Sequence, residues 1–347
     1  IMPSLVGSEM CIRDSFNLTA ANKTVNKLYK EHLVSTNQYI KSLGKRIEQN
    51  FLRSYGNAKF DRVIQFCGYE DEMILLYSQF KGQKTIWVHN DMLAEIKTRS
   101  NQRKDLLEYA YHTYDNVVAV TDDIVAPTQI LAGKDKKINI VKNTIDYKTI
   151  LTNSEQPIAL DPTTKCSVEP EKFYEIMQSD AKKFINVGRY SPEKGHDRLI
   201  DAFYKLWQKD NSIYLIIMGG NSRAKKYEEL IEKVNGMGLS ENVILLLSVS
   251  NPYPIIKACD GFILSSLYEG FGLVLAEADI LGLPIVSTDI TGPRTFMHKY
   301  GGTLIENSDD GVYNGLQILY SGEVKPLNVD YEAYNQECVA EFEKLFE

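Results

Sequence analysis

Hydrophobic and polar positions along the chain alternate between strand-like and helix-like patterns. In the first half, short apolar runs of strand length predict strands, and stretches with helical period lie between them. The predicted strands cover 62–67, 84–88, 116–120 and 138–141, and the predicted helices cover 24–53, 72–80, 101–114 and 124–131. Because strands that alternate with helices form parallel sheets covered on both faces, this half is predicted to be an α/β domain.

The pattern fades near 147–179, where Pro157, Pro162 and Pro170 occur, and a second alternating series follows. Its predicted strands cover 183–187, 213–218, 243–247, 261–264 and 284–287, and its predicted helices cover 171–178, 195–209, 224–237, 254–258, 274–281 and 331–346. We therefore expect two Rossmann-like domains that face each other, with a ligand at the carboxyl ends of the strands.

The expected domain organisation starts with a leader that is not native. Residues 1–15 have no usable period and lack the features of a signal peptide, and the segment 4–15 resembles translated sequencing-adapter read-through. The first domain is interpreted as truncated, because helical sequence begins it and no glycine-rich first loop precedes that sequence. The predicted parts are a leader at 1–15, an N-terminal domain at 16–155, a linker at 156–180, a second domain at 181–325 and a C-terminal helix at 326–347.

Composition narrows the class of protein. A length of 347 residues fits two domains, and 44% hydrophobic with 24% charged residues is an ordinary globular mixture. The five cysteines are scattered without a C-x-x-C pair, which favours a reduced, cytoplasmic protein without zinc knuckles. Residues 1–150 carry 21 Lys and Arg against 17 Asp and Glu, and the remainder carry 18 against 29. This asymmetry fits either an anionic acceptor or membrane surface meeting the first domain, or ordinary solvated surface.

The strongest local motif lies at 265–278, where a strand ends, a glycine-flanked turn follows and a helix begins. Such a turn leaves backbone N–H groups of the first helical turn unpaired, and these groups favour a diphosphate. Gly270 and Gly272 allow the backbone to approach a ligand closely. Glu269 is expected on the turn, and Glu277 about one turn into the helix, where a carboxylate can accept hydrogen bonds from ribose hydroxyls.

A second motif, at 186–195, directly follows another predicted strand. Arg189 and Lys194 on this loop can converge on a phosphate, the arginine by a forked contact and the lysine as a point charge. A cation pair of this kind is often only a surface loop, but its occurrence with the glutamate motif favours a functional reading. A dinucleotide-binding G-x-G-x-x-G motif is the alternative for the glycine turn, and Leu275 at its third glycine position argues against it.

Together these motifs resemble those of group 1 retaining glycosyltransferases, which are relatives of glycogen and sucrose synthases and have the GT-B fold. Glu269-x7-Glu277 is similar to the E-x7-E motif of that family, and 188–195 is similar to its G-R-x-x-x-x-K-G motif. The resemblance implies that Glu277 binds ribose and that Glu269 contacts hydroxyls of the transferred sugar. It also implies that the N–H groups of Phe271 and Gly272 meet the sugar, that those of Leu273 and Val274 meet the phosphate, and that Gly188 belongs to the cation loop.

Three further positions follow from the resemblance. Gly219 fits the next loop of the cleft, and Val249 lies in the loop that binds the base in relatives, beside Ser248, where many relatives carry glycine. His89 follows a predicted strand at the position where relatives have a histidine that contacts the donor sugar. A structural role for His89 remains the alternative, since lone histidines are usually structural.

The implied reaction transfers a hexosyl group from a nucleotide sugar to an acceptor hydroxyl with retention of anomeric configuration. The chain has no Asp-x-Asp, so we expect no cofactor and no metal, with Arg189, Lys194 and the helix N-terminus stabilising the leaving group. The expected acceptor is a glycan or a teichoic-acid-like or lipid-linked molecule, reached in the cytoplasm or by peripheral contact with the inner face of the membrane. No nucleic-acid partner is expected. A nucleotide-sugar epimerase and a non-catalytic nucleotide-sugar-binding fragment remain alternatives.

Overall fold

The computed structural model describes residues 60–66, 82–98, 103–220 and 224–347. The helices predicted at 24–53 and 72–80 and the leader predicted at 1–15 lie outside the described residues. The chain divides into two compact units. One contains the described residues up to Lys142 together with 341–347, and the other spans 143–340.

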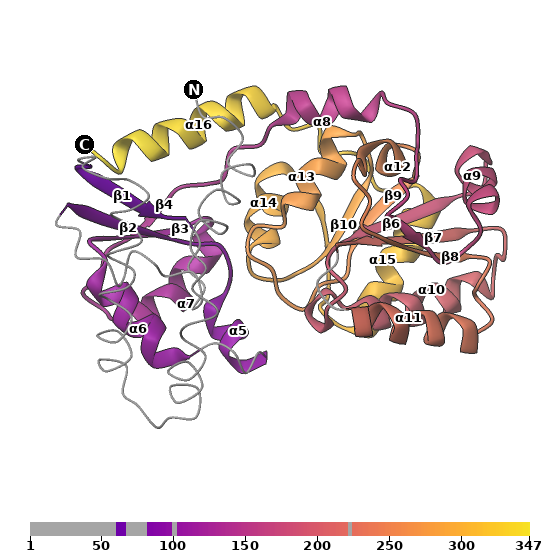
Figure 1. Cartoon of the computed structure of the whole chain (residues 1–347), viewed down its shortest axis with the longest axis horizontal. Helices are drawn as coiled ribbons and strands as arrows, with labels where there is room; N and C mark the ends of the chain where they lie inside the picture. Colours follow the sequence, from indigo (N-terminus) through magenta and orange to yellow (C-terminus); the bar gives the residue numbers. More distant parts are fainter. Residues whose placement is uncertain (1–59, 67–81, 99–102, 221–223) are drawn as a thin grey trace. The chain divides into compact units, whose positions relative to one another are not determined.

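The first unit has a parallel sheet in the order β1-β2-β3-β4, as the alternating pattern predicts. Its strands are β1 (Arg62–Gln65), β2 (Gln83–Val88), β3 (Asn116–Ala119) and β4 (Ile138–Ile140), and its helices are α5 (Met92–Thr98), α6 (Lys104–Thr113) and α7 (Asp122–Ala132). The three helices lie together on one face of the sheet (Figure 1). Their apolar sides and the strands form a core that includes Ile86, Leu106 and Val118.

The second unit has a larger sheet in the order β11-β10-β9-β6-β7-β8-β5, parallel except for β5. Its strands are β5 (Lys165–Cys166), β6 (Lys183–Val187), β7 (Tyr214–Gly219), β8 (Val243–Leu247), β9 (Gly261–Leu264), β10 (Ile285–Thr288) and β11 (Thr303–Ile305). Its helices are α8 (Tyr147–Ser154), α9 (Pro170–Gln178), η3 (Pro192–Lys194), α10 (His196–Trp207), α11 (Ala224–Gly236), α12 (Tyr253–Lys257), α13 (Leu273–Ile280), α14 (Pro293–Tyr300), α15 (Asp309–Ser321) and α16 (Tyr331–Lys344).

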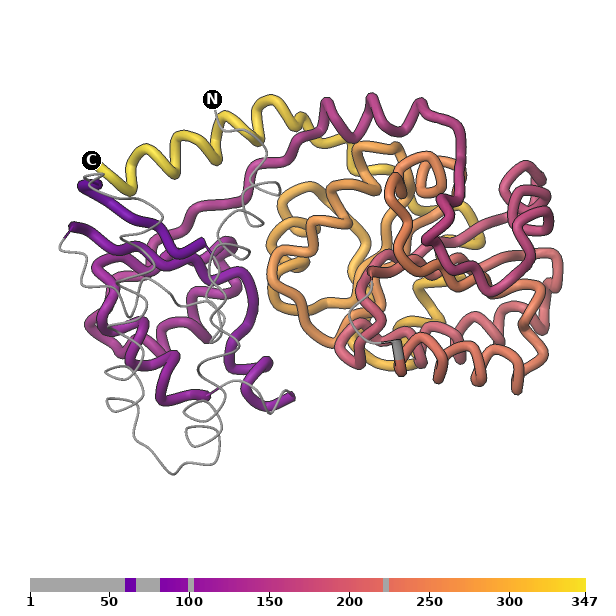
Figure 2. Tube along the Cα trace, in the orientation of Figure 1, coloured from indigo at the N-terminus to yellow at the C-terminus, as the bar shows by residue number. Residues whose placement is uncertain are grey.

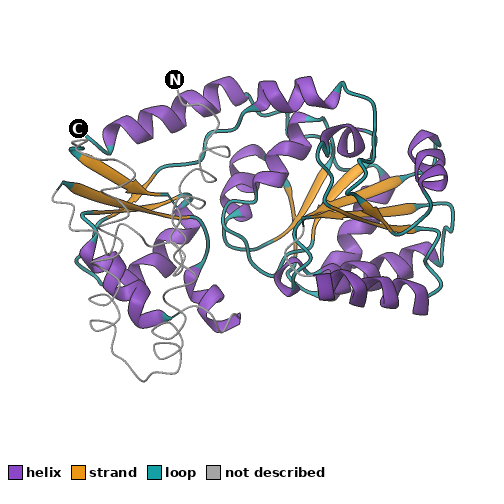
Figure 3. Ribbon diagram, viewed as in Figure 1, coloured by secondary structure: helices purple, strands orange, loops and turns teal. Residues whose placement is uncertain are grey.

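Helices cover both faces of this sheet. Figure 3 shows α10, α11 and α15 on one face and α12, α13 and α14 on the other. Strands β8 and β9 are buried along their whole length, which explains why they are continuous apolar runs rather than alternating ones. The burial of such runs between two helical layers supplies most of the stabilisation of an α/β sheet.

The strand order places a topological switch point between β6 and β9. From β6 the chain moves outward to β7 and β8 on one side, and then returns to β9, β10 and β11 on the other side. The connections that follow β6 and β9 lead to α10 and α13, on opposite faces of the sheet. In open α/β sheets, ligands bind in the crevice at such a switch point.

The structure adds elements that the sequence pattern did not predict. The segment near Tyr147, which we expected to lack periodic structure, forms helix α8, and the Asp146 side chain caps it by accepting a hydrogen bond from the Thr149 N–H at 3.1 Å. Helices α5, α14 and α15 and strands β5 and β11 are also additional. Their apolar stretches are short or interrupted, so periodicity alone is a weak signal for them.

Helix α16 begins in the second unit, and the last residues of the chain belong to the first (Figure 2). Within the first unit, Lys142 forms an ion pair with Glu341, and the Arg62 guanidinium lies 4.8 Å from the ring centroid of Phe346. The Arg62 Nη2 group also donates to the Phe346 carbonyl at 2.9 Å. No helix in the described part of the chain combines the length and the apolar content that crossing a bilayer requires.

Candidate functional site

Lys194 and Glu269 meet at the switch point of the second unit. Lys194 ends the short η3 helix after β6, and Glu269 lies in the loop after β9. The Lys194 Nζ atom lies 2.5 Å from Glu269 Oε1, and the Ser266 hydroxyl donates to the same oxygen at 2.7 Å. Both side chains of the ion pair are largely buried, so the attraction between them is screened much less than at an open surface. The structure thus brings together two charged residues that are 75 positions apart.

Arg189 lies on the same loop as Lys194 and contacts a different carboxylate. Its Nη2 atom lies 3.3 Å from Oε1 of Glu193, whose side chain is buried. The Arg189 side chain itself is about half exposed, at 48%. Within the described part of the chain this is its one polar side-chain contact, which leaves most of the five guanidinium N–H donors available to a ligand. Each predicted phosphate-binding cation therefore has an acidic residue that holds it in place.

The N-terminus of α13 offers unpaired backbone donors. Gly272 is the N-cap residue, has a left-handed φ of 77° and supplies no side-chain cap. The first backbone hydrogen bond of the helix runs from the Leu275 N–H to the Gly272 carbonyl at 2.9 Å. Among the described residues, the N–H groups of Leu273 and Val274 have no acceptor. Unpaired N–H groups and the helix dipole together favour an anion at this end of α13.

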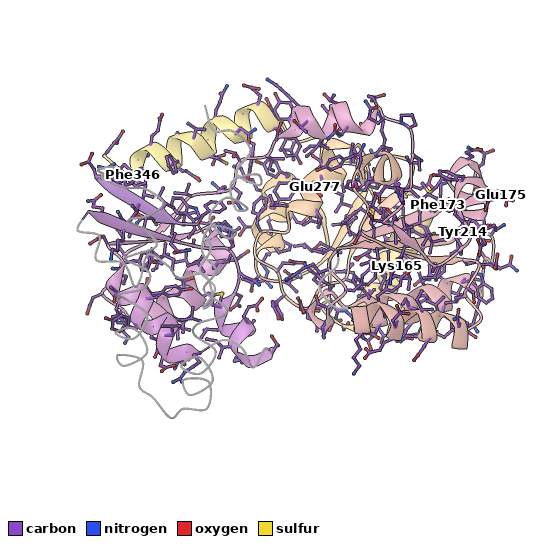
Figure 4. All side chains as sticks on the ribbon, in the orientation of Figure 1. Lys165, Phe173, Glu175, Tyr214, Glu277 and Phe346 are labelled. Carbon is purple, nitrogen blue, oxygen red and sulfur yellow. The ribbon has the colours of Figure 1, made fainter. Side chains whose placement is uncertain are left out.

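Glu277 lies on α13 (Figure 4) and has no hydrogen-bond or ion-pair partner in the part of the chain that the structure describes. Burial raises its pKa above the ordinary value. The charge of this carboxylate acts on the neighbouring Tyr253 side chain. Burial, followed by the charges of Glu277 and Asp146, raises the pKa of Tyr253 to about 12. A mostly buried carboxylate without a protein donor is suited to accept hydrogen bonds from a ligand hydroxyl.

Backbones approach each other closely around these loops, which explains several glycines. A Cβ atom on Gly219 would lie 2.5 Å from the Gly188 carbonyl oxygen. Gly292, after β10, has a φ of 93°, and a Cβ atom there would lie 1.7 Å from the carbonyl oxygen of Gly270. The Gly270 turn is therefore seated directly against the next loop, and no side chain fits between them.

The loop after β8 contains Ser248 and Val249, and two residues of the preceding segment hold it. The Thr164 hydroxyl donates to the Ser248 carbonyl at 3.0 Å, and the Ser250 hydroxyl donates to Asp161 at 2.6 Å. Ser248 has a left-handed φ of 64°. A left-handed residue without special stabilisation is most easily a glycine, so the conformation explains why glycine suits this position.

His89 follows β2 in the first unit. Its ring stacks edge-on against Phe66, with the ring centroids 4.5 Å apart. Burial lowers the pKa of His89 to about 4, and a hydrogen bond with the Phe66 backbone partly opposes this shift. Its Nε2 atom is buried and has no hydrogen-bond partner among the described residues. The imidazole is therefore neutral near pH 7.

Sequence reasoning missed residues that support the predicted ones. Ser266 and Glu193 orient Glu269 and Arg189, and Thr288 donates from its hydroxyl to the Ser266 carbonyl at 2.8 Å. Glu193 and Ser266 stand inside the recognised motifs, which was the available signal. Thr288 lies at the end of β10, and only the strand order shows that it reaches this loop.

Comparison with known proteins agrees with this architecture. The sequence profile of the family described as glycosyl transferases group 1 matches residues 168–336. The chain is 33% identical over 233 residues to an uncharacterized glycosyltransferase of Methanocaldococcus jannaschii, a match that covers 65% of this chain and 54% of that protein. It is 27% identical to a Campylobacter jejuni N-acetylgalactosaminyltransferase whose name specifies a diphospho-undecaprenol-linked acceptor, over 75% of this chain and 70% of that protein.

Solved structures show the same fold. A sucrose-phosphate synthase of Thermosynechococcus elongatus aligns with a TM-score of 0.68 and 16% identity, covering 90% of this chain and 80% of its own. The Anabaena protein HepE, solved with UDP and glucose, aligns with a TM-score of 0.67 and 17% identity, covering 88% and 81% of the two chains. The two α/β units with parallel sheets thus define a GT-B protein. The region that matches the group 1 glycosyltransferases lies in the second unit.

Proposed function

We propose that this protein transfers a hexosyl group from a nucleotide sugar to a hydroxyl group of its acceptor, with retention of anomeric configuration and without a metal. The observation that carries the proposal is the Lys194–Glu269 pair at the switch point, next to the unpaired N–H groups at the start of α13. A cation, a carboxylate and an anion-binding helix end at one crevice are the groups that a sugar diphosphate requires.

The donor would lie across the two loops. The diphosphate would meet Arg189, Lys194 and the first turn of α13, where Gly188 and Gly219 leave room for close approach. The unpaired carboxylate of Glu277 would accept hydrogen bonds from ribose. The base would lie along the loop with Val249, and Ser248 in place of glycine bears on which base is preferred.

The sugar would lie at Glu269. Its Oε1 atom already accepts from Lys194 and Ser266, so its other oxygen is the one available to sugar hydroxyls. The N–H groups of Phe271 and Gly272 would bind the same sugar. His89, neutral near pH 7, would contact it as an uncharged hydrogen-bonding group. Glu269 positions the sugar and does not act as a nucleophile in this proposal.

Departure of the nucleoside diphosphate develops negative charge on its terminal oxygen. Arg189, Lys194 and the α13 N-terminus would stabilise this charge electrostatically, and the departing phosphate would assist deprotonation of the acceptor. These groups supply positive charge without a divalent ion. The transfer rate in excess EDTA should therefore be about the same as the rate of the untreated enzyme.

The acceptor is proposed to be a glycan, a teichoic-acid-like polymer or a lipid-linked molecule. Support comes from the relatives. One is the Campylobacter jejuni transferase whose acceptor is linked to diphospho-undecaprenol, and another is a capsular polysaccharide biosynthesis glycosyltransferase of Staphylococcus aureus. TarM, whose structure was solved with α-GlcNAc-glycerol and UDP, shares the fold with a TM-score of 0.57. A protein with such an acceptor would work in the cytoplasm or at the inner face of the membrane.

A donor panel tests the proposal. Purified protein is incubated with UDP-glucose, UDP-N-acetylglucosamine, GDP-mannose and ADP-glucose, with and without glycerol phosphate polymer or undecaprenyl-linked glycan. Proton NMR then follows the anomeric signals. Release of diphosphate with an α-linked product from an α-linked donor supports retaining transfer. A changed sugar on an intact donor identifies an epimerase, and binding without turnover identifies a non-catalytic binder. Either result contradicts the proposal.

A further inference from the structure

Arg198 is a buried cation beneath the donor loop, and no motif assigns it a role. It lies on α10 and is 9% exposed. Its Nε and Nη2 atoms donate to the Ser265 carbonyl at 2.9 and 2.7 Å. The Nη2 atom also donates to the Ser266 carbonyl at 2.8 Å and to Oδ1 of Asn307 at 2.8 Å. One side chain thus connects α10 to the end of β9 and to the segment after β11.

The hydrogen-bond acceptors of Arg198 are unusual for a buried cation. In the described part of the chain they are all neutral oxygens, and burial lowers the pKa of Arg198 from its ordinary value. A guanidinium keeps its charge even so. Burying a charge without an anionic partner at hydrogen-bond distance costs free energy, so its retention at this place calls for a reason beyond packing.

The place itself supplies a reason. Ser265 and Ser266 directly follow strand β9 and lead into the loop that carries Glu269. Arg198 donates to both carbonyls and holds them in a fixed direction, as a forked donor can, and so fixes the backbone that leads to Glu269.

Neighbouring contacts fix the same short segment from other sides. The Thr288 hydroxyl donates to the Ser266 carbonyl at 2.8 Å, and the Asn307 Nδ2 atom donates to the Leu267 carbonyl at 3.2 Å. Gly195 has a φ of 65°, and a Cβ atom there would lie 2.1 Å from the Ser265 carbonyl oxygen. The start of the Glu269 loop therefore lies directly against the loop of Lys194, and Arg198 on α10 adds a charged link beside the Lys194–Glu269 pair.

We infer that Arg198 is a positioning residue for the donor sugar, which sets the Glu269 loop relative to the Lys194 loop. The inference rests on the proposed function. Arg198 acts through the backbone that leads to Glu269, which is placed at the sugar. Its loss should therefore weaken recognition of the sugar more than recognition of the nucleoside diphosphate.

The test compares Arg198→Met with Arg198→Lys and with Lys205→Met, which removes a half-exposed cation from the same helix. Isothermal titration calorimetry measures the binding of three ligand pairs, which are UDP with UDP-glucose, GDP with GDP-mannose, and ADP with ADP-glucose. For the pair that the wild type binds, Arg198→Met should keep the dissociation constant of the diphosphate within about threefold of the wild-type value. The same variant should raise the dissociation constant of the nucleotide sugar by about tenfold or more, as expected for the loss of a charge-assisted contact. Arg198→Lys should restore part of this difference, and Lys205→Met should match the wild type.

Equal weakening of both ligands by Arg198→Met and by Arg198→Lys would show a purely structural role and overturn the inference. Unchanged binding of both would also overturn it. Arg198→Lys keeps the charge, so it carries the comparison if Arg198→Met fails to fold. A wild type that binds no diphosphate or nucleotide sugar of the panel would instead contradict the proposed function, and the inference with it.

Discussion

Lys194 Nζ and Glu269 Oε1 lie 2.5 Å apart and link two loops that leave adjacent strands in opposite directions. The pair places a positive charge for a diphosphate and a negative charge for sugar hydroxyls side by side. Their attraction also keeps each from drifting out of the crevice when no donor is bound. The site is thus organised before the donor arrives, which reduces the cost of ordering it on binding.

Replacing Glu269 by Gln separates its role as the counter-ion of Lys194 from its proposed role in binding the sugar hydroxyls. The amide can still accept from Ser266, but the charge of Lys194 loses its counter-ion. We expect the dissociation constant of the nucleoside diphosphate to stay the same or to improve by up to about threefold, and the transfer rate to fall by roughly 100-fold through lost sugar contacts. Calorimetry and a coupled diphosphate-release assay measure the two effects. Glu306→Gln, on an exposed side chain, is the control. Diphosphate binding weakened tenfold by Glu269→Gln would refute the division of roles.

Glu277 gives a prediction with a defined sign in pH. Burial raises the pKa of Glu277 in the folded state, so between the unfolded and the folded pKa the folded protein binds more protons than the unfolded chain. The contribution of Glu277 to the free energy of unfolding therefore falls as the pH rises through this interval. Glu277→Gln should therefore be more stable than the wild type at pH 8. The difference should vanish below about pH 4, where Glu277 is protonated in both the folded and the unfolded state. Thermal unfolding at both pH values measures this.

The same variant should bind donor less well, because an amide is a weaker acceptor for ribose hydroxyls than a carboxylate. We expect a loss of about tenfold in affinity for the nucleoside diphosphate. A variant that is less stable at pH 8 and binds donor normally would show that Glu277 has a protein partner and no role in binding.

His89 has the opposite sign. Its pKa is lowered to about 4, so the unfolded chain binds a proton that the folded state does not, and stability falls as pH falls from about 6.5 to 4. This effect is on the order of 3 kcal/mol for a shift of this size. His89→Gln should remove that part of the acid sensitivity, and His112→Gln, on an exposed residue of α6, should not. An NMR titration of the His89 ring with a midpoint near 6.5 would disprove the burial argument.

Gly292 tests the close approach of the loops. Its φ is 93°, and a Cβ atom would lie 1.7 Å from the Gly270 carbonyl oxygen, whereas Gly282 has a φ of 80° with no atom within 4 Å of a Cβ. Both alanine variants carry backbone strain of about 1 kcal/mol, but only Gly292→Ala adds a collision. It should lower stability by a further 1–3 kcal/mol or so and weaken diphosphate binding. Equal effects of the two variants in chemical denaturation would contradict the packing described.

The sequence predicted the alternating architecture, and it singled out the loops after β6 and β9 as the candidate site, for a physical reason. Buried parallel strands such as β6 and β8 are continuous apolar runs, and Arg189, Lys194, Glu269 and Glu277 stand in motifs whose spacing is fixed by the turn after each strand. Local chemistry determines both features, so both are visible locally.

The remainder depended on contacts between distant parts of the chain. The order of the strands, which sets Lys194 beside Glu269, has no local signal. Arg198 looks like any charged residue of an amphipathic helix until β9 is placed next to α10. Helix α8 was missed because nearby prolines and weak periodicity favoured a connection, and the cap by Asp146 outweighed that pattern.

The central claim is that Arg189 and Lys194 of the second unit hold the diphosphate of the donor. Calorimetry of the double variant Arg189→Met with Lys194→Met measures it most directly, with Lys205→Met and Lys209→Met together as a control that removes the same two charges from the surface of the same unit. We predict that the site variant loses at least about 100-fold in affinity for the diphosphate that the wild type binds, since each charge-assisted contact contributes about 1.5–3 kcal/mol. The control should bind as the wild type does. Donor binding that persists within threefold in the site variant would contradict the account.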